Sequence, residues 1–189
     1  MRKLVLFVHT SLDGFVGGPN GEMDWIHVDD EIFDYVGDYT DKADTALYGR
    51  ATFEMMENYW PTAADEPDAS KHDIRHSKWY NQVMKVVISE TMRGRDSNKT
   101  KIISENIAAQ INELKRQEGN DIIMFGSPGA AHSLMALNLI DEYWLFVNPI
   151  LLKYGIPLFK NVASRTRLKL VNNVTFSSGV VCLRYERLA

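Results

Sequence analysis

The chain has 189 residues, a length that predicts a single domain spanning residues 1–189. Hydrophobic residues make up 45% of it and charged residues 24%, as in ordinary globular proteins, and the net charge of −4 argues against a nucleic-acid partner. The single cysteine, Cys182, excludes an internal disulfide and a metal site made of several cysteines.

The amino-terminal apolar run at residues 3–9 predicts a strand that is buried on both faces of a sheet. This run is too short for a signal peptide or a membrane span, so we expect a cytoplasmic protein with no membrane partner. Residues 10–25 are rich in glycine and predict a long, bent loop with little structure of its own. Loops of this length inside a compact domain are often functional.

Predicted strands and helices alternate from there to about residue 140. We expect helices over 29–39, 51–60, 74–83, 105–118 and 128–139, and strands over 44–49, 85–89, 100–104, 121–127 and 141–152. Residues 168–188 alternate between apolar and polar types and turn at Ser178-Gly179, as an antiparallel hairpin does. This order predicts an α/β fold: a mostly parallel central sheet flanked by helices, with an antiparallel C-terminal hairpin.

Two turns between a strand and a helix favour phosphate binding, because ligands of open α/β sheets bind beyond the carboxyl ends of the strands. In the first turn, GRAT, Gly49 lets a ligand approach the backbone closely, and Arg50 offers a planar fork that fits a phosphate. Thr52 adds a hydroxyl group. The alternative for Arg50 is a surface ion pair with Glu54, four residues later.

The second turn is GSPGAA, in which Gly126 ends an apolar strand and Pro128 stands in the first turn of a helix. Free backbone amides and the helix dipole at this point suit a pyrophosphate, although a tight turn alone needs the same residues. Two such turns on neighbouring loops of one sheet are best explained together, by a dinucleotide.

Four motifs in order, SLDGFVGGPNGEMDW, TALYGRATFEMM, FGSPGAAHSLM and LIDEYWLFVNPILL…GIPLF, resemble the stand-alone bacterial relatives of dihydrofolate reductase. These relatives are grouped with the reductase domain of the bifunctional riboflavin-biosynthesis deaminase-reductase. The resemblance covers nearly the whole chain and implies a dihydrofolate-reductase-like fold with NADPH as cofactor. The deaminase activity is not implied, because its zinc motif is missing from the sequence.

The resemblance also implies roles for individual residues. Arg50 would hold the 2′-phosphate of the cofactor, and the loop 13–25 would cover the nicotinamide. The residues implied to bind the cofactor are Gly49, Arg50, Thr52, Ser89, Gly126, Ser127, Pro128 and Gly129. One position departs from the pattern: many relatives have a basic residue after the serine that ends strand three, whereas Glu90 stands here. The preference for NADPH over NADH therefore stays open, and so does FMN.

The residues that would serve catalysis are acids and aromatics near the first helix. In dihydrofolate reductases a carboxylate on this helix, after a tryptophan, binds the amidine-like edge of the pterin. Counting from Trp25 points to Asp30, and counting back from Phe33, the expected substrate-packing aromatic, points to Asp29. Both acids could instead cap the helix. Asp13 is a third candidate, near the nicotinamide or as a turn residue.

The leading hypothesis is an NADPH-dependent reductase of a C=N or C=O bond in a small heterocycle, pterin-like or pyrimidine-like. One alternative is a catalytically silent nucleotide-binding module of the same fold. Another is the riboflavin-pathway 5-amino-6-(5-phosphoribosylamino)uracil reductase, which would need a basic cluster for which only Lys153 and Lys160 are available. His72 and His76 have the spacing of a metal pair without an evident third ligand, so we expect no metal. We also expect a homodimer, formed through residues 144–152 and 179–185.

Overall fold

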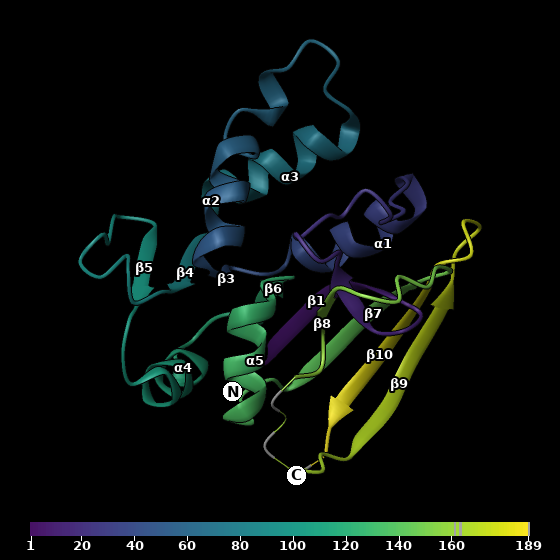
Figure 1. The fold of residues 1–189 in the computed structure, drawn as a ribbon. Coiled ribbons are helices and arrows are strands. Elements are labelled where there is room, and N and C mark those ends of the chain that lie inside the picture. The colour runs from purple at the N-terminus through teal and green to yellow at the C-terminus, as the bar shows by residue number, and fades with distance from the viewer. Residues whose placement is uncertain (161, 163, 189) are drawn as a thin grey trace.

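A computed structural model describes residues 1–160, 162 and 164–188, so residues 161, 163 and 189 of the predicted domain lie outside the description. An eight-stranded sheet has the order β5-β4-β3-β6-β1-β7-β10-β9 (Figure 1). Its strands are β1 Leu4–Ser11, β3 Thr45–Gly49, β4 Met84–Ile88, β5 Thr100–Ile103, β6 Ile122–Phe125, β7 Glu142–Asn148, β9 Leu168–Thr175 and β10 Val181–Arg187. The strands from β5 to β7 are parallel, and β10 runs antiparallel to both of its neighbours.

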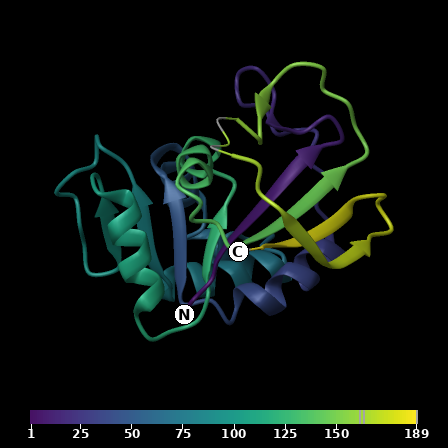
Figure 2. The same cartoon turned by 90° about the horizontal axis from the view of Figure 1, so that it is seen from below.

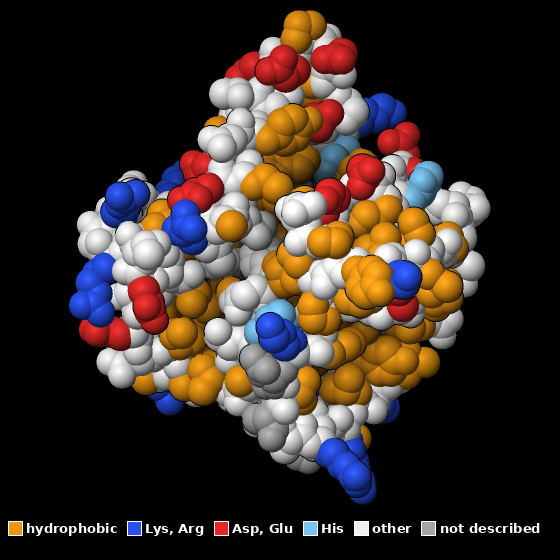
Figure 3. All heavy atoms as spheres, in the orientation of Figure 1, with side chains coloured by type: hydrophobic (Ala, Val, Ile, Leu, Met, Phe, Trp, Pro, Cys, Tyr) orange, Lys and Arg blue, Asp and Glu red, His pale blue; other side chains and the backbone are white. Residues whose placement is uncertain are grey.

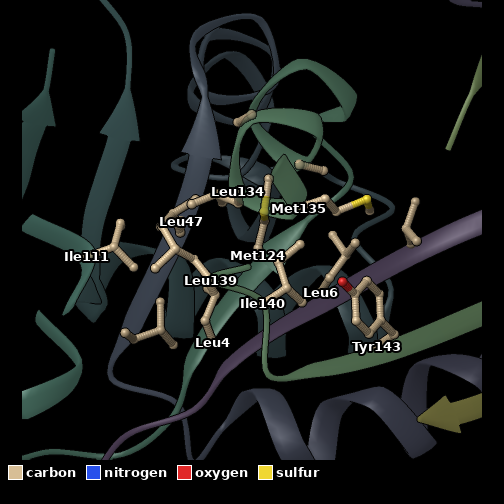
Figure 4. Close-up of a cluster of buried hydrophobic side chains, with 14 of the residues drawn as sticks. Leu4, Leu6, Leu47, Ile111, Met124, Leu134, Met135, Leu139, Ile140 and Tyr143 are labelled. Carbon is tan, nitrogen blue, oxygen red and sulfur yellow. The ribbon is translucent and has the colours of Figure 1, made fainter. Parts of the chain in front are cut away.

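Helices cover both faces of the sheet, as the alternating pattern predicts (Figures 1 and 2). The helices are α1 Asp30–Thr40, α2 Arg50–Tyr59, α3 Lys71–Gln82, α4 Ile107–Arg116 and α5 Pro128–Ala136, with a short 3-10 helix, Ala63–Asp65, before α3. The helices α4 and α5 bury aliphatic side chains against one face (Figure 4). On the other face α1, α2 and α3 enclose a core rich in aromatic rings. The predicted fold class is confirmed.

The glycine-rich loop differs from the prediction, because part of it is a strand. Phe15–Gly17 form β2, which pairs antiparallel with β8, Ile156–Pro157. Gly155 permits this pairing, since a Cβ atom there would lie only 2.3 Å from the carbonyl oxygen of Gly17. The loop after β1 is thus held to a segment about 140 residues later in the chain.

The amino ends of the parallel strands carry buried charged side chains, and each is paired. Arg2 forms an ion pair with Asp44, and Lys115 donates to the carbonyl of Leu139 at 2.6 Å. Glu142, the first residue of β7, accepts from Arg184 at 2.8 Å and from the indole of Trp144 at 2.6 Å. In the part of the chain that the structure describes, no helix is long and apolar enough to span a bilayer.

Candidate active site

Two helix amino termini open at the same edge of the sheet. Helix α2 begins directly after β3, helix α5 begins after β6, and β3 and β6 are neighbours in the sheet. Ser127 joins the two turns: its hydroxyl accepts from the Gly49 amide at 3.1 Å and donates to the Phe125 carbonyl at 3.0 Å. Because the first amides of each helix have no partner within the helix, this edge presents a set of donors to an anion.

The backbone of both turns explains why small residues stand there. A Cβ atom on Gly49 would lie 3.3 Å from the Cβ of Ala130, so the glycine lets the first turn of α5 approach the end of β3. Gly126 and Ser127 both have left-handed backbone, with φ of 50° and 54°. Glycine adopts this conformation without steric cost, whereas Ser127 is held in it by the two hydrogen bonds of its hydroxyl.

A cavity of about 390 Å³ lies beside these turns, over the ends of β3, β4 and β5. Its lining includes seven of the eight residues implied to bind the cofactor at this end: Gly49, Arg50, Thr52, Ser89, Ser127, Pro128 and Gly129. Arg50 lines this cavity and also forms an ion pair with Glu54 at 3.1 Å, with about half of each side chain exposed. The ion pair with Glu54 and the predicted contact of Arg50 with a phosphate are thus compatible. Glu90, which stands where many relatives have a basic residue, lines the same cavity.

A second cavity, of about 440 Å³, adjoins the first and shares Ala51, Thr52, Ser127 and Pro128 with it. It is enclosed by β1, β6, the loop after β1, and the helices α1, α2 and α3. Gly126 lies here, together with a lining that is mainly apolar. Figure 3 shows this concentration of hydrophobic side chains between α1 and the α2–α3 pair. The two turns therefore open on one side of the molecule, into two adjoining cavities.

The structure places Phe33 in the wall of the larger cavity and leaves Trp25, Asp29 and Asp30 out of it. Asp29 is the N-cap of α1 and accepts from the Ile32 amide at 2.9 Å. This backbone bond, with help from the nearby His27, lowers the pKa of Asp29. The Asp30 side chain is exposed in the first helical turn.

Asp13 likewise lies outside both cavity walls. Its carboxylate accepts from the Ser11 hydroxyl at 2.7 Å and from the amides of Leu152 and Lys153 at 3.1 and 2.8 Å. These bonds, with Ser11 first, lower the pKa of Asp13. The acid therefore ties the loop after β1 to the loop after β7. The indole of Trp25 also bonds locally, to the Glu22 carbonyl at 3.0 Å.

Three histidines line the larger cavity, and sequence reasoning did not place any of them there. His9, near the end of β1, stacks on Phe146 with ring centroids 4.9 Å apart, and burial lowers its pKa to about 4. The Asn148 side-chain oxygen accepts from the His27 amide, so its nitrogen is the group 3.4 Å from His9 Nδ1. This contact assigns the proton of neutral His9 to Nε2. The sequence held one signal for His9, which stands at the carboxyl end of a predicted strand, the edge of the sheet at which ligands bind.

His72 and His76 lie one turn apart on α3, with ring centroids 5.4 Å apart. His76 packs 4.1 Å from Trp60 and 5.0 Å from Trp79, measured between centroids, and burial lowers its pKa to about 3. Burial also lowers the pKa of His72, which stacks on Phe33. Among the described residues, no group of three or more metal-ligating side chains is present.

Comparison with known proteins gives one family and one fold. The RibD C-terminal domain model matches residues 2–182. The uncharacterized protein YyaP of Bacillus subtilis (strain 168) is 38% identical over 187 residues, which are 98% of this chain and 95% of that protein. A solved protein from Shewanella sp. PV-4, named provisionally for riboflavin biosynthesis, has a TM-score of 0.72 at 21% identity over all of both chains.

A second solved structure has the same fold at lower identity. Dihydrofolate reductase from Enterococcus faecalis, solved with NADP(H) and an inhibitor named RAB-propyl, has a TM-score of 0.63 at 13% identity. The match covers 99% of this chain and 97% of that enzyme. At this identity the likeness concerns the fold, and it agrees with the strand order and the flanking helices described above.

Proposed function

The chain belongs to the RibD C-terminal domain family, and on that premise we propose that it is an NADPH-dependent reductase of a small heterocyclic substrate. The observation that carries this proposal is the pair of adjoining cavities at the carboxyl edge of the sheet, which share residues of two helix amino termini in their walls. A dinucleotide has an adenosine end, a pyrophosphate and a nicotinamide end, and these three parts suit the smaller cavity, the turns and the larger cavity. The Enterococcus faecalis enzyme, of the same fold, was solved with NADP(H).

The residues divide the work of binding between them. Arg50 would hold the 2′-phosphate in the smaller cavity, where Ser89 and Thr52 add hydroxyl groups. The amides at the starts of α2 and α5 would face the pyrophosphate, with Ser127 fixing their spacing. When bound, the dihydronicotinamide supplies a hydride to a C=N or C=O bond of the substrate.

The protein's part in catalysis is then to align two rings and exclude water. The larger cavity is suited to this, because its walls are mainly apolar and the β2 segment lies over it. The predicted acids support this alignment from outside the cavity. Asp29 fixes the start of α1, and Asp13 fixes the loop after β1.

Fluorescence titration with NADPH and NADH tests this proposal, because Trp60 lines the larger cavity and reports on its occupation. We expect Arg50→Ala to weaken NADPH binding roughly 10- to 100-fold, the value of charge-assisted bonds to a phosphate, and to leave NADH nearly unchanged. Glu54→Gln is the matched control: it removes the ion-pair partner of Arg50 and should leave NADPH binding equal or tighter. Equal losses for the two cofactors in Arg50→Ala would contradict the assigned role.

Catalysis is tested separately from binding by following NADPH oxidation with a panel of neutral and charged heterocycles. Oxidation that requires a substrate supports the reductase. Tight NADPH binding without oxidation by any compound would favour the silent nucleotide-binding module.

We also propose a homodimer, but not through strand edges of 144–152 and 179–185. These residues lie largely in β7 and β10, each of which has a neighbour on both sides in the sheet. The support comes from apolar side chains on the last strands: Leu145 and its partner Leu183 are only partly buried, and Leu168 and Leu170 of β9, the strand paired with β10, are exposed. Figure 3 shows hydrophobic side chains across this region. Gel filtration at micromolar concentration should give a dimer, and a monomer alone would contradict this proposal.

A further inference from the structure

The substrate end of the larger cavity has an unusual charge distribution. Among the described residues that line it, there is no aspartate, glutamate, lysine or arginine. Helix α1, which would carry the pterin-binding acid of a dihydrofolate reductase, instead turns Ile32, Phe33 and Val36 toward the cavity. Lys153 and Lys160, the available basic residues for a phosphorylated substrate, also lie outside its walls.

A charged group that enters this cavity meets no charged side chain in its walls, and the charges that act on His72, from Asp30, Asp34, Asp73 and Arg75, stand outside those walls. An unpaired charge in an apolar site costs several kcal/mol, by order of magnitude, and the cost falls directly on binding. Neither the protonated amidine edge of a pterin nor a phosphoribosyl group meets a counter-charge here. The apolar walls instead suit the faces of a flat, uncharged ring.

The polar groups at this end are the two imidazoles of α3. His72 stacks on Phe33 with ring centroids 3.5 Å apart and ring planes within 8° of each other. His76 is enclosed by Trp60, Trp79 and Phe125. Within the described part of the chain, no side chain or backbone group hydrogen-bonds to either ring, so both keep a donor and an acceptor for a ligand.

We propose that the substrate is an uncharged planar heterocycle with an adjacent donor and acceptor, such as a lactam or imide edge, which His72 and His76 recognise. The two histidines are specificity-determining residues in this assignment. The inference rests on the proposed reductase function and names the substrate class of the same site. It also separates this protein from an enzyme that selects a cationic pterin or a phosphorylated pyrimidine.

The test uses two bicyclic probes of one size, quinazoline-2,4-dione, which is neutral and has an imide edge, and 2,4-diaminoquinazoline, which has a basic amidine edge. Binding of each is measured by calorimetry, once on the protein alone and once with NADP⁺ in excess. We expect the dione to bind at least about tenfold more tightly, the effect of one unsatisfied polar group. Equal or tighter binding of the diamino compound would overturn the inference.

Two variants sharpen the test. His76→Phe keeps an aromatic ring but removes both polar atoms, and we expect it to weaken dione binding about tenfold and to affect NADPH binding less than dione binding. The control is His27→Phe, at a histidine whose side chain is mostly exposed and lies outside the cavity. Val36→Asp places a carboxylate in the cavity wall and should reverse the preference between the probes.

The outcomes separate this inference from the proposed function. If the protein binds NADPH but prefers the diamino probe, only the proposed substrate class is wrong. If the protein prefers the dione but binds no NADPH, the proposed reductase function is wrong, whereas the ligand class assigned to the cavity stands. The wild-type comparison needs no variant, so a variant that fails to fold leaves the test intact.

Discussion

The two ends of the parallel sheet use opposite chemistry. At the amino end, buried charges such as Arg2, Lys115 and Glu142 are each held in ion pairs or hydrogen bonds. At the carboxyl end, the larger cavity has neutral histidines and apolar walls. The difference indicates that charged side chains stabilise the fold at the amino end of the sheet. At the carboxyl end the available donors are backbone amides and neutral rings, which an added ligand can satisfy.

The largest expected effect lies at the charged end. Glu142→Ala leaves Arg184 and the Trp144 indole without their shared acceptor, and we expect it to lower the free energy of unfolding by about 3–5 kcal/mol. Urea denaturation measures this change. Glu105→Ala is the matched control, since its pair with Arg93 is largely exposed and should contribute less than about 1 kcal/mol. Equal effects of the two substitutions would remove the contrast between a buried and a surface charge.

The next effect is a pH dependence that originates at the uncharged end. The folded protein holds the pKa values of His9 and His76 at about 4 and 3, below the ordinary 6.5, so the unfolded chain binds more protons. Stability should therefore be full above pH 6.5 and fall as the pH drops toward 4, by at most about 1.4 kcal/mol per pH unit for each histidine. His72 and Asp73, the titratable groups facing His76, act in opposite directions and more weakly than burial.

Urea denaturation between pH 7 and 5.5 checks this, above the range in which most carboxylates titrate. We expect His76→Phe to remove roughly 1–2 kcal/mol of the loss over that interval. An unchanged slope in this variant would show that His76 is accessible to protons in the folded state.

The smallest effect concerns the link between the two turns. Ser127→Ala removes the acceptor of the Gly49 amide and the bond that holds a left-handed residue, and should cost about 1–2 kcal/mol of stability. NADPH binding should weaken several-fold, because the spacing of the two helix starts is no longer fixed. Ser97→Ala, at an exposed turn where only the backbone is bonded, is the control. A variant that binds NADPH as wild type does would show that Ser127 only stabilises the turn.

Much of the fold could be predicted from local patterns. Apolar runs located the parallel strands, and glycine and proline located the turns at Gly49 and Pro128, because these features depend on neighbours in the sequence. The β2–β8 pair could not be predicted in this way. Its partners are distant in the chain, and the glycine pattern of residues 10–25 alone indicates only a loop.

The candidate site divides similarly. The residues predicted to bind the cofactor lie together because their turns follow strands that are neighbours in the sheet. The acid register could not be settled, since Asp29 is engaged as the helix cap and the cavity face of α1 is apolar. His72 and His76 stand in a polar helical stretch, and their burial depends on Phe33 and Trp60 from other helices. No local pattern contains that information.

The most direct measurement is a crystal structure of the protein with NADPH. We expect the pyrophosphate between the Gly49 and Ser127 turns, Arg50 on the 2′-phosphate, and the nicotinamide in the larger cavity beside His9. A cofactor bound elsewhere, or one whose phosphates touch neither helix start, would contradict the account.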